Sequence, residues 1–267
     1  MTWGSFSNTH LLTLGLALLV NILIYLILKR NTRKKQILAL FIFSLFGVGF
    51  IVYEMFSSGA DILKHLPLSF EMISIILLPI AVLTRWKRLC NLLLIWSAGS
   101  ILALVFNSSM AHLELPTFEF VTYFTMHLFG AGIPILLFEL NLVRRETKTI
   151  KPTVIFTLIM YTAIHLFNLI VNNVNGWSVA NGVNYMSTLA PTTATLDFFY
   201  AIIPSAYWYM ILALPLFLLY VLYWYLPEIL DNRRRRRPLR KKLDDIDKYY
   251  DNLEDEYIDR IIKKHHG

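Results

Sequence analysis

Residues 10–35 read HLLTLGLALLVNILIYLILKRNTRKK, an apolar run that ends in a cluster of basic residues. A helix needs about 20 apolar residues to cross the hydrocarbon core of a bilayer, and this run is close to that length. Residues 1–9 contain no Lys or Arg, whereas a cleavable signal peptide opens with a positive segment. An uncharged N-terminus, an apolar run and then a basic cluster together predict a retained membrane helix with its N-terminus outside.

The composition of the whole chain extends this interpretation. Of 267 residues, 56% are hydrophobic, and the mean hydropathy is +0.54, which is too apolar for a soluble domain of this size. The single cysteine, Cys90, excludes a disulfide within the chain and a cysteine-rich metal site. The sequence also lacks a phosphate-binding glycine loop and the HExxH and GxSxG motifs, so it predicts no cofactor and no metal.

Seven segments are long and apolar enough to be membrane helices, which predicts an all-α, seven-helix polytopic membrane bundle. Glu71 and Pro79 make the third segment the least regular, although proline is tolerated where neighbouring helices satisfy the freed backbone groups. The segments are 10–28, 36–56, 66–84, 89–108, 118–141, 152–172 and 201–226. They form a transmembrane domain at 1–226, followed by a charged tail at 227–267.

The basic residues fix the orientation of this bundle. With the N-terminus outside, 24 of the 25 Lys and Arg residues fall in inner segments, and only Lys64 lies outside. Cytoplasmic loops carry such an excess of positive charge. The sequence therefore predicts a cytoplasmic C-terminus and a multi-pass protein of the cell membrane.

The outer loop at 173–200 is polar and unusually long for a connection between packed helices. Loops of this length often act as lids or binding loops. The alternative is a flexible connecting loop with no binding role.

The cytoplasmic tail combines a basic run with an acidic, amphipathic stretch. The run should bind anionic lipid of the inner leaflet, and we expect no nucleic-acid partner because the run stands at a membrane exit. A heptad-like stripe from Leu243 to Tyr257 predicts a tail helix that lies on the membrane surface, contacts a protein partner or associates with a second copy. The basic run consists of Arg233, Arg234, Arg235, Arg236 and Arg237.

Polar residues inside the predicted helices gather in the outer half, which indicates a water-accessible cavity there. Ionisable residues in a membrane are costly and point to function. At a rise of 1.5 Å per residue, Glu71 lies about 8 Å deep and His127 about 13 Å deep. A Glu–His pair of this kind can serve as a base and its orienting group. His165 and Asn168, in the sixth segment, and Glu119, at the start of the fifth, are expected to border the cavity.

Two stretches carry a resemblance to a known family. Residues 62–88, ILKHLPLSFEMISIILLPIAVLTRWKR, contain a Leu-Pro-Leu element at 66–68 and a basic turn at 85–88, and residues 115–136, LPTFEFVTYFTMHLFGAGIPIL, contain His127. They resemble the YwaF-type family of bacterial integral membrane proteins, which is similar to a eukaryotic transmembrane acyltransferase of ether-phospholipid synthesis. The resemblance covers roughly residues 60–226 and implies that the protein belongs to a bacterial cell membrane.

The resemblance implies a catalytic assignment, and two departures change it. In the acyltransferase an acyl chain is thought to pass through a Cys while the histidine of helix five acts as base. Here Glu71 stands at the expected Cys position and Ser69 at an expected His position. A carboxylate would form an anhydride, a poor resting intermediate. The resemblance therefore implies His127 as base, Glu71 as its partner or a substrate-orienting group, and Ser69 as an alternative nucleophile.

Two functions follow from these features. The first is a lipid-handling, acyltransferase-like enzyme at the outer leaflet, with membrane lipids as its ligands. The second is a non-catalytic scaffold or accessory protein that binds lipid and docks partners through its tail.

The predicted orientation has a direct test with reporter fusions. A cytoplasmic reporter should be active when fused after residue 230 and inactive when inserted within 173–200, because the positive-inside rule places these sites on opposite sides. The reverse pattern would overturn the predicted topology.

Overall fold

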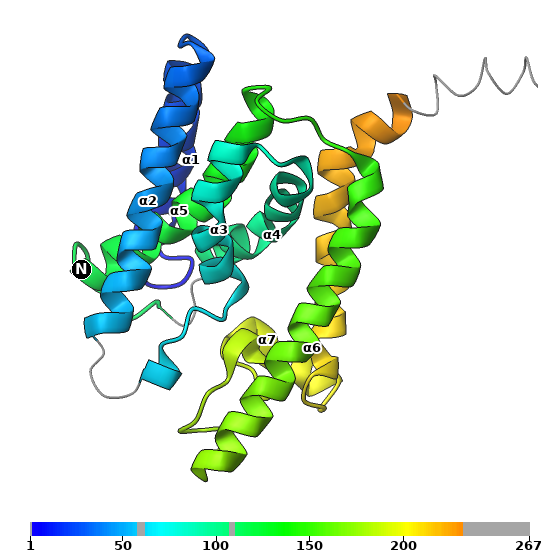
Figure 1. The fold of residues 1–267 in the computed structure, drawn as a ribbon. Helices are drawn as coiled ribbons and strands as arrows, with labels where there is room; N and C mark the ends of the chain where they lie inside the picture. Colours follow the sequence, from blue (N-terminus) through cyan, green and yellow to red (C-terminus); the bar gives the residue numbers. More distant parts are fainter. Residues whose placement is uncertain (1, 58–61, 107–109, 232–267) are drawn as a thin grey trace, which may run out of the picture. The chain divides into compact units, whose positions relative to one another are not determined.

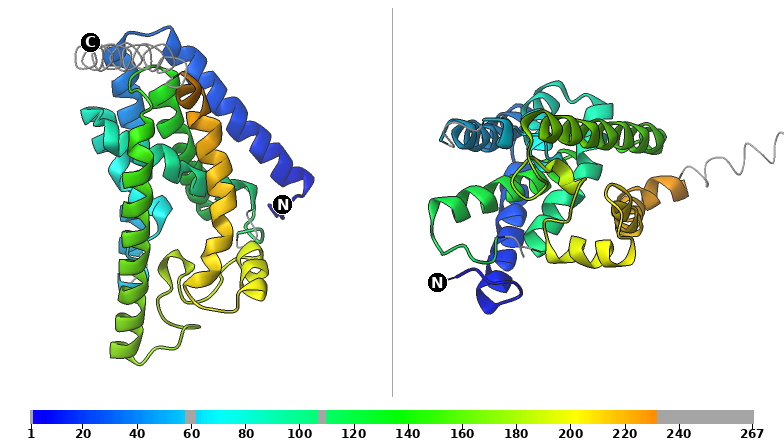
Figure 2. Two further views of the ribbon diagram at one scale, coloured as in Figure 1. Left: turned by 90° about the vertical axis from the view of Figure 1, so that its right-hand side faces the viewer. Right: turned by 90° about the horizontal axis from the view of Figure 1, so that it is seen from below.

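The fold is helical throughout the part that the computed structural model describes, residues 2–57, 62–106 and 110–231. Short 3₁₀ turns η1 to η4 connect the helices, at Ile62–Lys64, Thr147–Thr149, Tyr185–Ser187 and Trp208–Ala213. The helices are α1 (Asn8–Lys29), α2 (Arg33–Ser57), α3 (Phe70–Thr84), α4 (Lys87–Val105), α5 (Phe118–Glu139), α6 (Ile150–Asn175), α7 (Ala194–Ile202) and a final helix at 214–231. The chain runs up and down through them (Figure 1, Figure 2).

Six of these segments are long and apolar enough to cross a membrane: α1, α2, α4, α5, η2 with α6, and Trp208–Asp231. The predicted all-α polytopic bundle is confirmed. The remaining apolar helix, α3, has 15 residues and is therefore about 23 Å long, shorter than the hydrocarbon core. It starts four residues later than predicted, because Ser69 caps it and Pro67 precedes that cap.

The last predicted span, 201–226, differs from the structure. The chain forms the nine-residue helix α7, which ends at Ile202, and the long helical segment begins only at Trp208. Pro204 explains the break, because proline disfavours helical geometry in the residue before it. The polar outer loop is therefore followed by a short helix that is too short to span a membrane.

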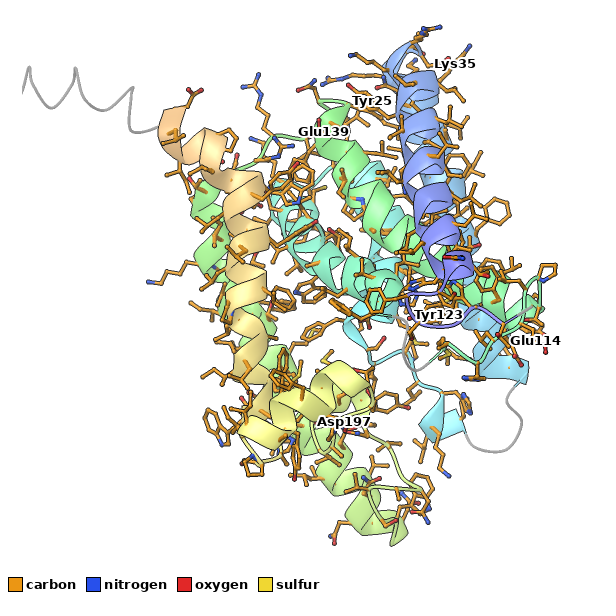
Figure 3. The ribbon with its side chains drawn as sticks, turned by 180° about the vertical axis from the view of Figure 1, so that it is seen from behind. Tyr25, Lys35, Glu114, Tyr123, Glu139 and Asp197 are labelled. Atoms are coloured by element: carbon orange, nitrogen blue, oxygen red, sulfur yellow. The ribbon has the colours of Figure 1, made fainter. Side chains whose placement is uncertain are left out.

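Helices α2 to α5 form the packed centre of the bundle. Helix α3 contacts α2, α4 and α5, and α5 also contacts α1, α2 and α4. Ile75 of α3 fits between two glycines, Gly47 of α2 and Gly130 of α5, and both would bring an added Cβ within 4 Å of its side chain. Lys35 and Glu139 lie at one end of the bundle and Glu114 at the other (Figure 3), as alternating helix directions require.

The N-terminal residues 2–7 form an ordered segment against the outer ends of α4 and α5. Trp3 is fully buried against Leu104 and Phe120, and its indole N–H donates to Thr13 Oγ1 at 2.7 Å. The ring of His10 accepts at Nδ1 from the backbone N–H of Phe6 at 2.9 Å, so its Nε2 donates to the carbonyl of Leu104 at 2.8 Å. These bonds anchor the start of α1 beside the end of α4.

At the opposite end, a polar cluster fixes the α5–α6 connection. The Glu146 carboxylate pairs with Lys87 at 2.9 Å and Lys148 at 3.2 Å, while its backbone N–H donates to Asn91 Oδ1 at 3.1 Å. The hydrogen bond from Lys87 is the main cause that holds the pKa of the Glu146 carboxyl below its usual range, with Lys148 adding to it.

The chain divides into two compact units, Met1–Val221 and Leu222–Gly267. All of the features described below belong to the first unit. In the second unit, residues 222–231 are helical. The predicted tail helix, its heptad stripe and the run Arg233 to Arg237 lie outside the described residues, so the predicted tail domain and its partners stay predictions.

Two glycines on α2 give a matched test of this packing. Replacing Gly47 with Ala puts a Cβ 2.7 Å from Ile75 Cγ2, whereas Gly49 has no atom within 4 Å of such a Cβ. G47A should destabilise the bundle by about 1–3 kcal/mol through overpacking. G49A should be neutral or stabilising by up to about 1 kcal/mol, because Ala favours helix. Thermal or denaturant unfolding in detergent would measure both; equal stabilities would contradict the packing.

Candidate functional site

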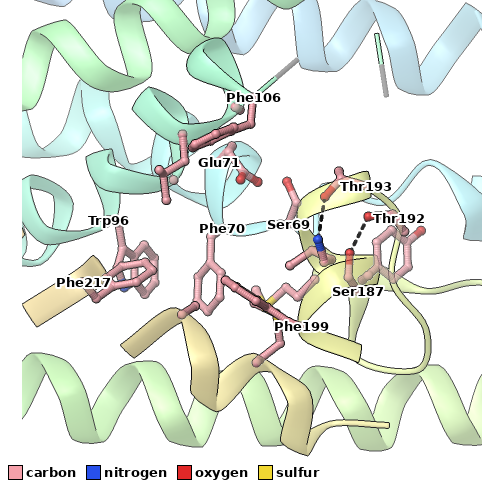
Figure 4. Close-up of a pocket in the computed structure, with 18 of the residues that line it drawn as sticks. Ser69, Phe70, Glu71, Trp96, Phe106, Ser187, Thr192, Thr193, Phe199 and Phe217 are labelled. Carbon is pink, nitrogen blue, oxygen red and sulfur yellow. Dashed lines mark hydrogen bonds between the residues drawn. The ribbon is translucent and has the colours of Figure 1, made fainter. Parts of the chain in front are cut away.

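A cavity of about 450 Å³ lies beside the N-terminal end of α3 and the outer half of α4 (Figure 4). Helices α3 and α4 contribute to its wall, together with α6, the loop before α7, α7 itself and the start of the final helix. Its size falls in the range of small-molecule sites. The lining residues are Ser69, Phe70, Glu71, Trp96, Gly99, Leu102, Ala103, Phe106, Thr157, Asn184, Tyr185, Met186, Ser187, Thr192, Thr193, Leu196, Phe199, Met210, Ala213, Leu216 and Phe217.

One face of α4 forms a long wall of the cavity. Residues 96, 99, 102–103 and 106 follow helical spacing, so this wall is about 15 Å long. At its inner end, the Trp96 indole donates to Thr157 Oγ1 of α6 at 2.8 Å and packs edge-on against Phe70, with ring centroids 5.3 Å apart. The next residue of α4, Ser97, is hydrogen-bonded through Oγ to the hydroxyl of Tyr220 in the final helix at 2.7 Å. These contacts join α4 to α3, α6 and the final helix near the inner end of the cavity.

Glu71 provides the charge at the cavity. It lies in the first turn of α3, where the partial positive charge of a helix N-terminus favours a carboxylate. Its side chain lies against Gly99 of α4, where an added Cβ would come 3.4 Å from Glu71 Oε1. Within the described residues the Glu71 carboxylate makes no hydrogen bond and no ion pair. It is therefore available to a ligand.

His127 lies on α5 and does not line the cavity. Its ring is buried and tilted against Tyr123, with centroids 4.1 Å apart. Nδ1 lies 2.8 Å from the Tyr123 carbonyl oxygen, which only accepts, so Nδ1 carries the proton and Nε2 carries the lone pair. Among the described residues, no hydrogen bond or ion pair joins His127 to Glu71, although the Glu71 charge is close enough to influence both Tyr123 and His127.

The structure separates the other predicted site residues from this group. Ser69 lines the cavity, but its hydroxyl oxygen accepts from Met72 N at 3.2 Å and so caps α3. His165 packs against Tyr207, with ring centroids 5.0 Å apart, and Glu119 is exposed at the start of α5. Neither His165, Asn168 nor Glu119 belongs to the lining of this cavity. Their predicted role as substrate contacts stays a prediction.

Asn168 and Asn172 of α6 hold the outer loop in place. Asn168 is fully buried; its amide donates to the Tyr185 carbonyl and to Thr188 Oγ1, both at 2.9 Å, and accepts from Tyr185 N at 3.2 Å. Asn172 binds Val183 at both backbone groups, at 2.8 and 2.9 Å. These amides replace hydrogen bonds that the irregular backbone would otherwise lack. Of the two alternatives for this loop, the structure therefore favours an ordered element.

Tyr185 connects this loop to the segment before α3. Its hydroxyl donates to the Leu63 carbonyl and accepts from Leu66 N at 3.0 Å. Burial raises the pKa of the Tyr185 hydroxyl above its usual value. Nearby, the Lys64 ammonium lies 4.6 Å from the centre of the Trp177 ring, a cation–π contact. The loop is thus attached to two separate parts of the chain.

The next two residues of the loop adopt a strained backbone at the cavity wall. Met186 and Ser187 have φ values of 55° and 52°, in the left-handed region that non-glycine residues rarely adopt. The Tyr209 hydroxyl donates to the Ser187 carbonyl, and Ser187 Oγ bonds Thr192 Oγ1 at 2.6 Å (Figure 4). Such strain persists only where surrounding contacts enforce it, and it is common at binding sites. Sequence reasoning missed these residues because strain leaves no local sequence signal.

The fold and this cavity define a polytopic α-helical membrane protein. The described residues contain no group of three His, Cys, Asp or Glu side chains that could hold a metal ion.

The chain belongs to the TMEM164 family, a transmembrane family whose model matches residues 5–225. No curated protein and no solved structure matches the chain. The match includes every helix of the first unit. The narrower YwaF-type relationship, the acyl-transfer chemistry and the bacterial cell membrane stay predictions.

The role of Asn168 in holding the outer loop can be tested by hydrogen–deuterium exchange. N168L removes the partners of two Tyr185 backbone groups, each costing about 1–3 kcal/mol if left buried and unpaired. Hydrogen–deuterium exchange of residues 183–189 should rise strongly in this variant. N175L is the matched control, because Asn175 is exposed and bonds only to its own helix at Val171. Unchanged exchange in N168L would show that Asn168 does not hold the loop.

Proposed function

We propose that this protein transfers an acyl chain between membrane lipids in the cavity beside α3 and α4. The observation that carries the proposal is the Glu71 carboxylate, which is unpaired within the described residues and stands in a cavity lined mostly by apolar and aromatic side chains. An ionisable group at membrane depth is costly, and its presence there points to a function. The apolar inner end suits a hydrocarbon chain, and the polar outer groups suit the ester and head group.

The proposed reaction is a direct transfer between two lipids. The hydroxyl oxygen of a lysolipid attacks the ester carbonyl carbon of a donor lipid while the Glu71 carboxylate takes the hydroxyl proton. The donor's ester C–O bond then breaks, and the proton passes from Glu71 to the departing glycerol oxygen. The products are a new ester and the donor's lysolipid. This route needs no covalent intermediate on the protein.

The roles of the two residues are exchanged relative to the sequence-based hypothesis. Glu71 contacts the cavity, so we assign it as the base, and His127 becomes a positioning residue that acts through Glu71. Ser69 is better explained as the cap of α3, because its oxygen already accepts from Met72 N.

A non-catalytic lipid-binding protein is the second candidate. The observation that favours it is the lack of a thiol at the described cavity. Cys90 is fully buried near the other end of α4, with Sγ 3.6 Å from the Ala81 carbonyl oxygen. The predicted docking of partners and of anionic lipid through the tail would belong to this role.

An isotope-transfer assay tests the enzyme hypothesis. The purified protein in nanodiscs would receive a donor lipid with a labelled acyl chain and an unlabelled lysolipid, and mass spectrometry would follow the new ester. E71Q should lower the rate by roughly 10²–10⁴-fold, the usual contribution of a general base. E114Q is the control, because Glu114 is an exposed outer carboxylate that does not line the cavity.

The proposed positioning role of His127 is tested by the pH–rate profile, which a purely structural role would not change. H127A should alter the shape of the pH–rate profile, because it removes a titratable imidazole that the proposal makes a positioning partner of Glu71. Absence of transfer by the folded wild-type protein, or transfer unaffected by E71Q, would reject the enzyme and leave the lipid-binding candidate.

A further inference from the structure

Two buried serines, Ser74 of α3 and Ser100 of α4, differ from other helical hydroxyls of the protein. Each is only 1% exposed, yet within the described residues neither hydroxyl has a hydrogen-bond partner. A buried hydroxyl without a partner is costly, so its presence points to a further partner such as an ordered water. Elsewhere in the helices, hydroxyls donate to a carbonyl three or four residues earlier, as at Ser44, Thr84, Ser97, Thr157 and Thr162.

Ser100 lies between the parts of the chain that carry Glu71 and His127. The residue before it, Gly99, would bring an added Cβ 3.4 Å from Glu71 Oε1. On the other side, Ser100 Oγ is 2.6 Å from the position that a Cβ of Gly130 would occupy on α5. Gly130 is three residues after His127, so both lie on one face of that helix. The Ser100 hydroxyl is therefore next to both helix faces.

Ser74 approaches the same region from α3. It is three residues after Glu71, so the two side chains share a face of the helix. Its neighbour Ile75 packs against Gly130, the glycine that Ser100 also meets. Helices α3, α4 and α5 all contact one another here. The two unpaired hydroxyls thus belong to one buried region at the junction of three helices.

The hydrogen-bonding groups of this region complement a water molecule. His127 Nε2 carries a lone pair, because Nδ1 donates to the Tyr123 carbonyl, and an ionised Glu71 only accepts. Ser74 and Ser100 each have a hydroxyl proton to donate. A water has two protons and two lone pairs, so one molecule can satisfy all four groups. Buried waters typically make about three such bonds to groups that the protein leaves unpaired.

We infer that Ser74 and Ser100 hold a buried water that joins the Glu71 carboxylate to His127 Nε2. The water donates to these two acceptors and accepts from the two serine hydroxyls. It binds one carboxylate oxygen and leaves the other for the substrate proton, so Ser74 and Ser100 are positioning residues. The inference rests on the proposed function, and it supplies the contact through which His127 acts on Glu71.

A double-mutant cycle on stability tests the water independently of catalysis. S100A removes one donor to the water, so it should lower the folding equilibrium constant of the full-length protein in detergent roughly fivefold. In an H127F background one acceptor of the water is already lost, and this factor should shrink by roughly threefold or more. S44A is the control: Ser44 is buried and bonds to Phe41 of its own helix, so its effect should be equal in both backgrounds.

The isotope-transfer assay tests the positioning role. S100A and S74A should each lower kcat roughly tenfold with little change in KM, because neither serine lines the cavity. Both should change the pH–rate profile in the same direction as H127A, whereas S44A should leave it unchanged. G130A keeps the Ser100 hydroxyl but would displace it, so it should resemble S100A and replaces that variant if S100A fails to fold.

A structure at a resolution that shows ordered waters should place one within hydrogen-bond distance of Ser100 Oγ and His127 Nε2. Three results would overturn the inference: no water at that position, a neutral or stabilising S100A, or no coupling between S100A and H127F. Failure of the proposed function is distinguishable. Coupling without acyl transfer by the wild-type protein would remove only the enzyme, and transfer that S100A and S74A leave unchanged would remove only the positioning role inferred here.

Discussion

The constraint on which the site depends is the cost of placing the Glu71 carboxyl among apolar helices. A carboxyl at this depth needs a polar or aqueous neighbourhood, and the chain supplies it locally. Helix α3 is short and capped by Ser69, so Glu71 stands at a helix N-terminus. Gly99 on α4 leaves room for its side chain, and a bulkier residue there would push the carboxyl away from the wall of α4. The cavity exists where these three features meet.

The outer loop completes that neighbourhood, and its order comes from buried amides. Asn168 and Asn172 satisfy loop backbone groups at Val183 and Tyr185, and Tyr185 in turn binds residues 63 and 66 before α3. The wall that carries Glu71 and the loop that faces it are therefore parts of one hydrogen-bonded assembly. This linkage explains how a site of irregular backbone keeps a defined form beside a membrane.

Much of the fold was predictable, because apolar length and basic charge are local signals. Pro204 marks the break between α7 and the final helix, but the sequence analysis missed this break because the apolar run continues past Pro204.

Which of the predicted site residues line the cavity was not predictable. Position along a helix gives depth, but the rotation of α5 about its axis decides that His127 does not line the cavity. Asn168 bonds to the Tyr185 backbone and to the Thr188 hydroxyl, 17 and 20 residues away, and no local pattern reveals such partners.

Accessibility of position 71 to water tests the account most directly. The protein has one cysteine, fully buried Cys90, so a Cys90→Ser background gives a clean starting point. In that background, E71C should react with a membrane-impermeant thiol reagent added from outside, whereas I75C, at a buried position one turn further along α3, should not. A folded E71C protein that resists the reagent, or reacts only from the cytoplasmic side, would contradict an outward-facing cavity built around Glu71.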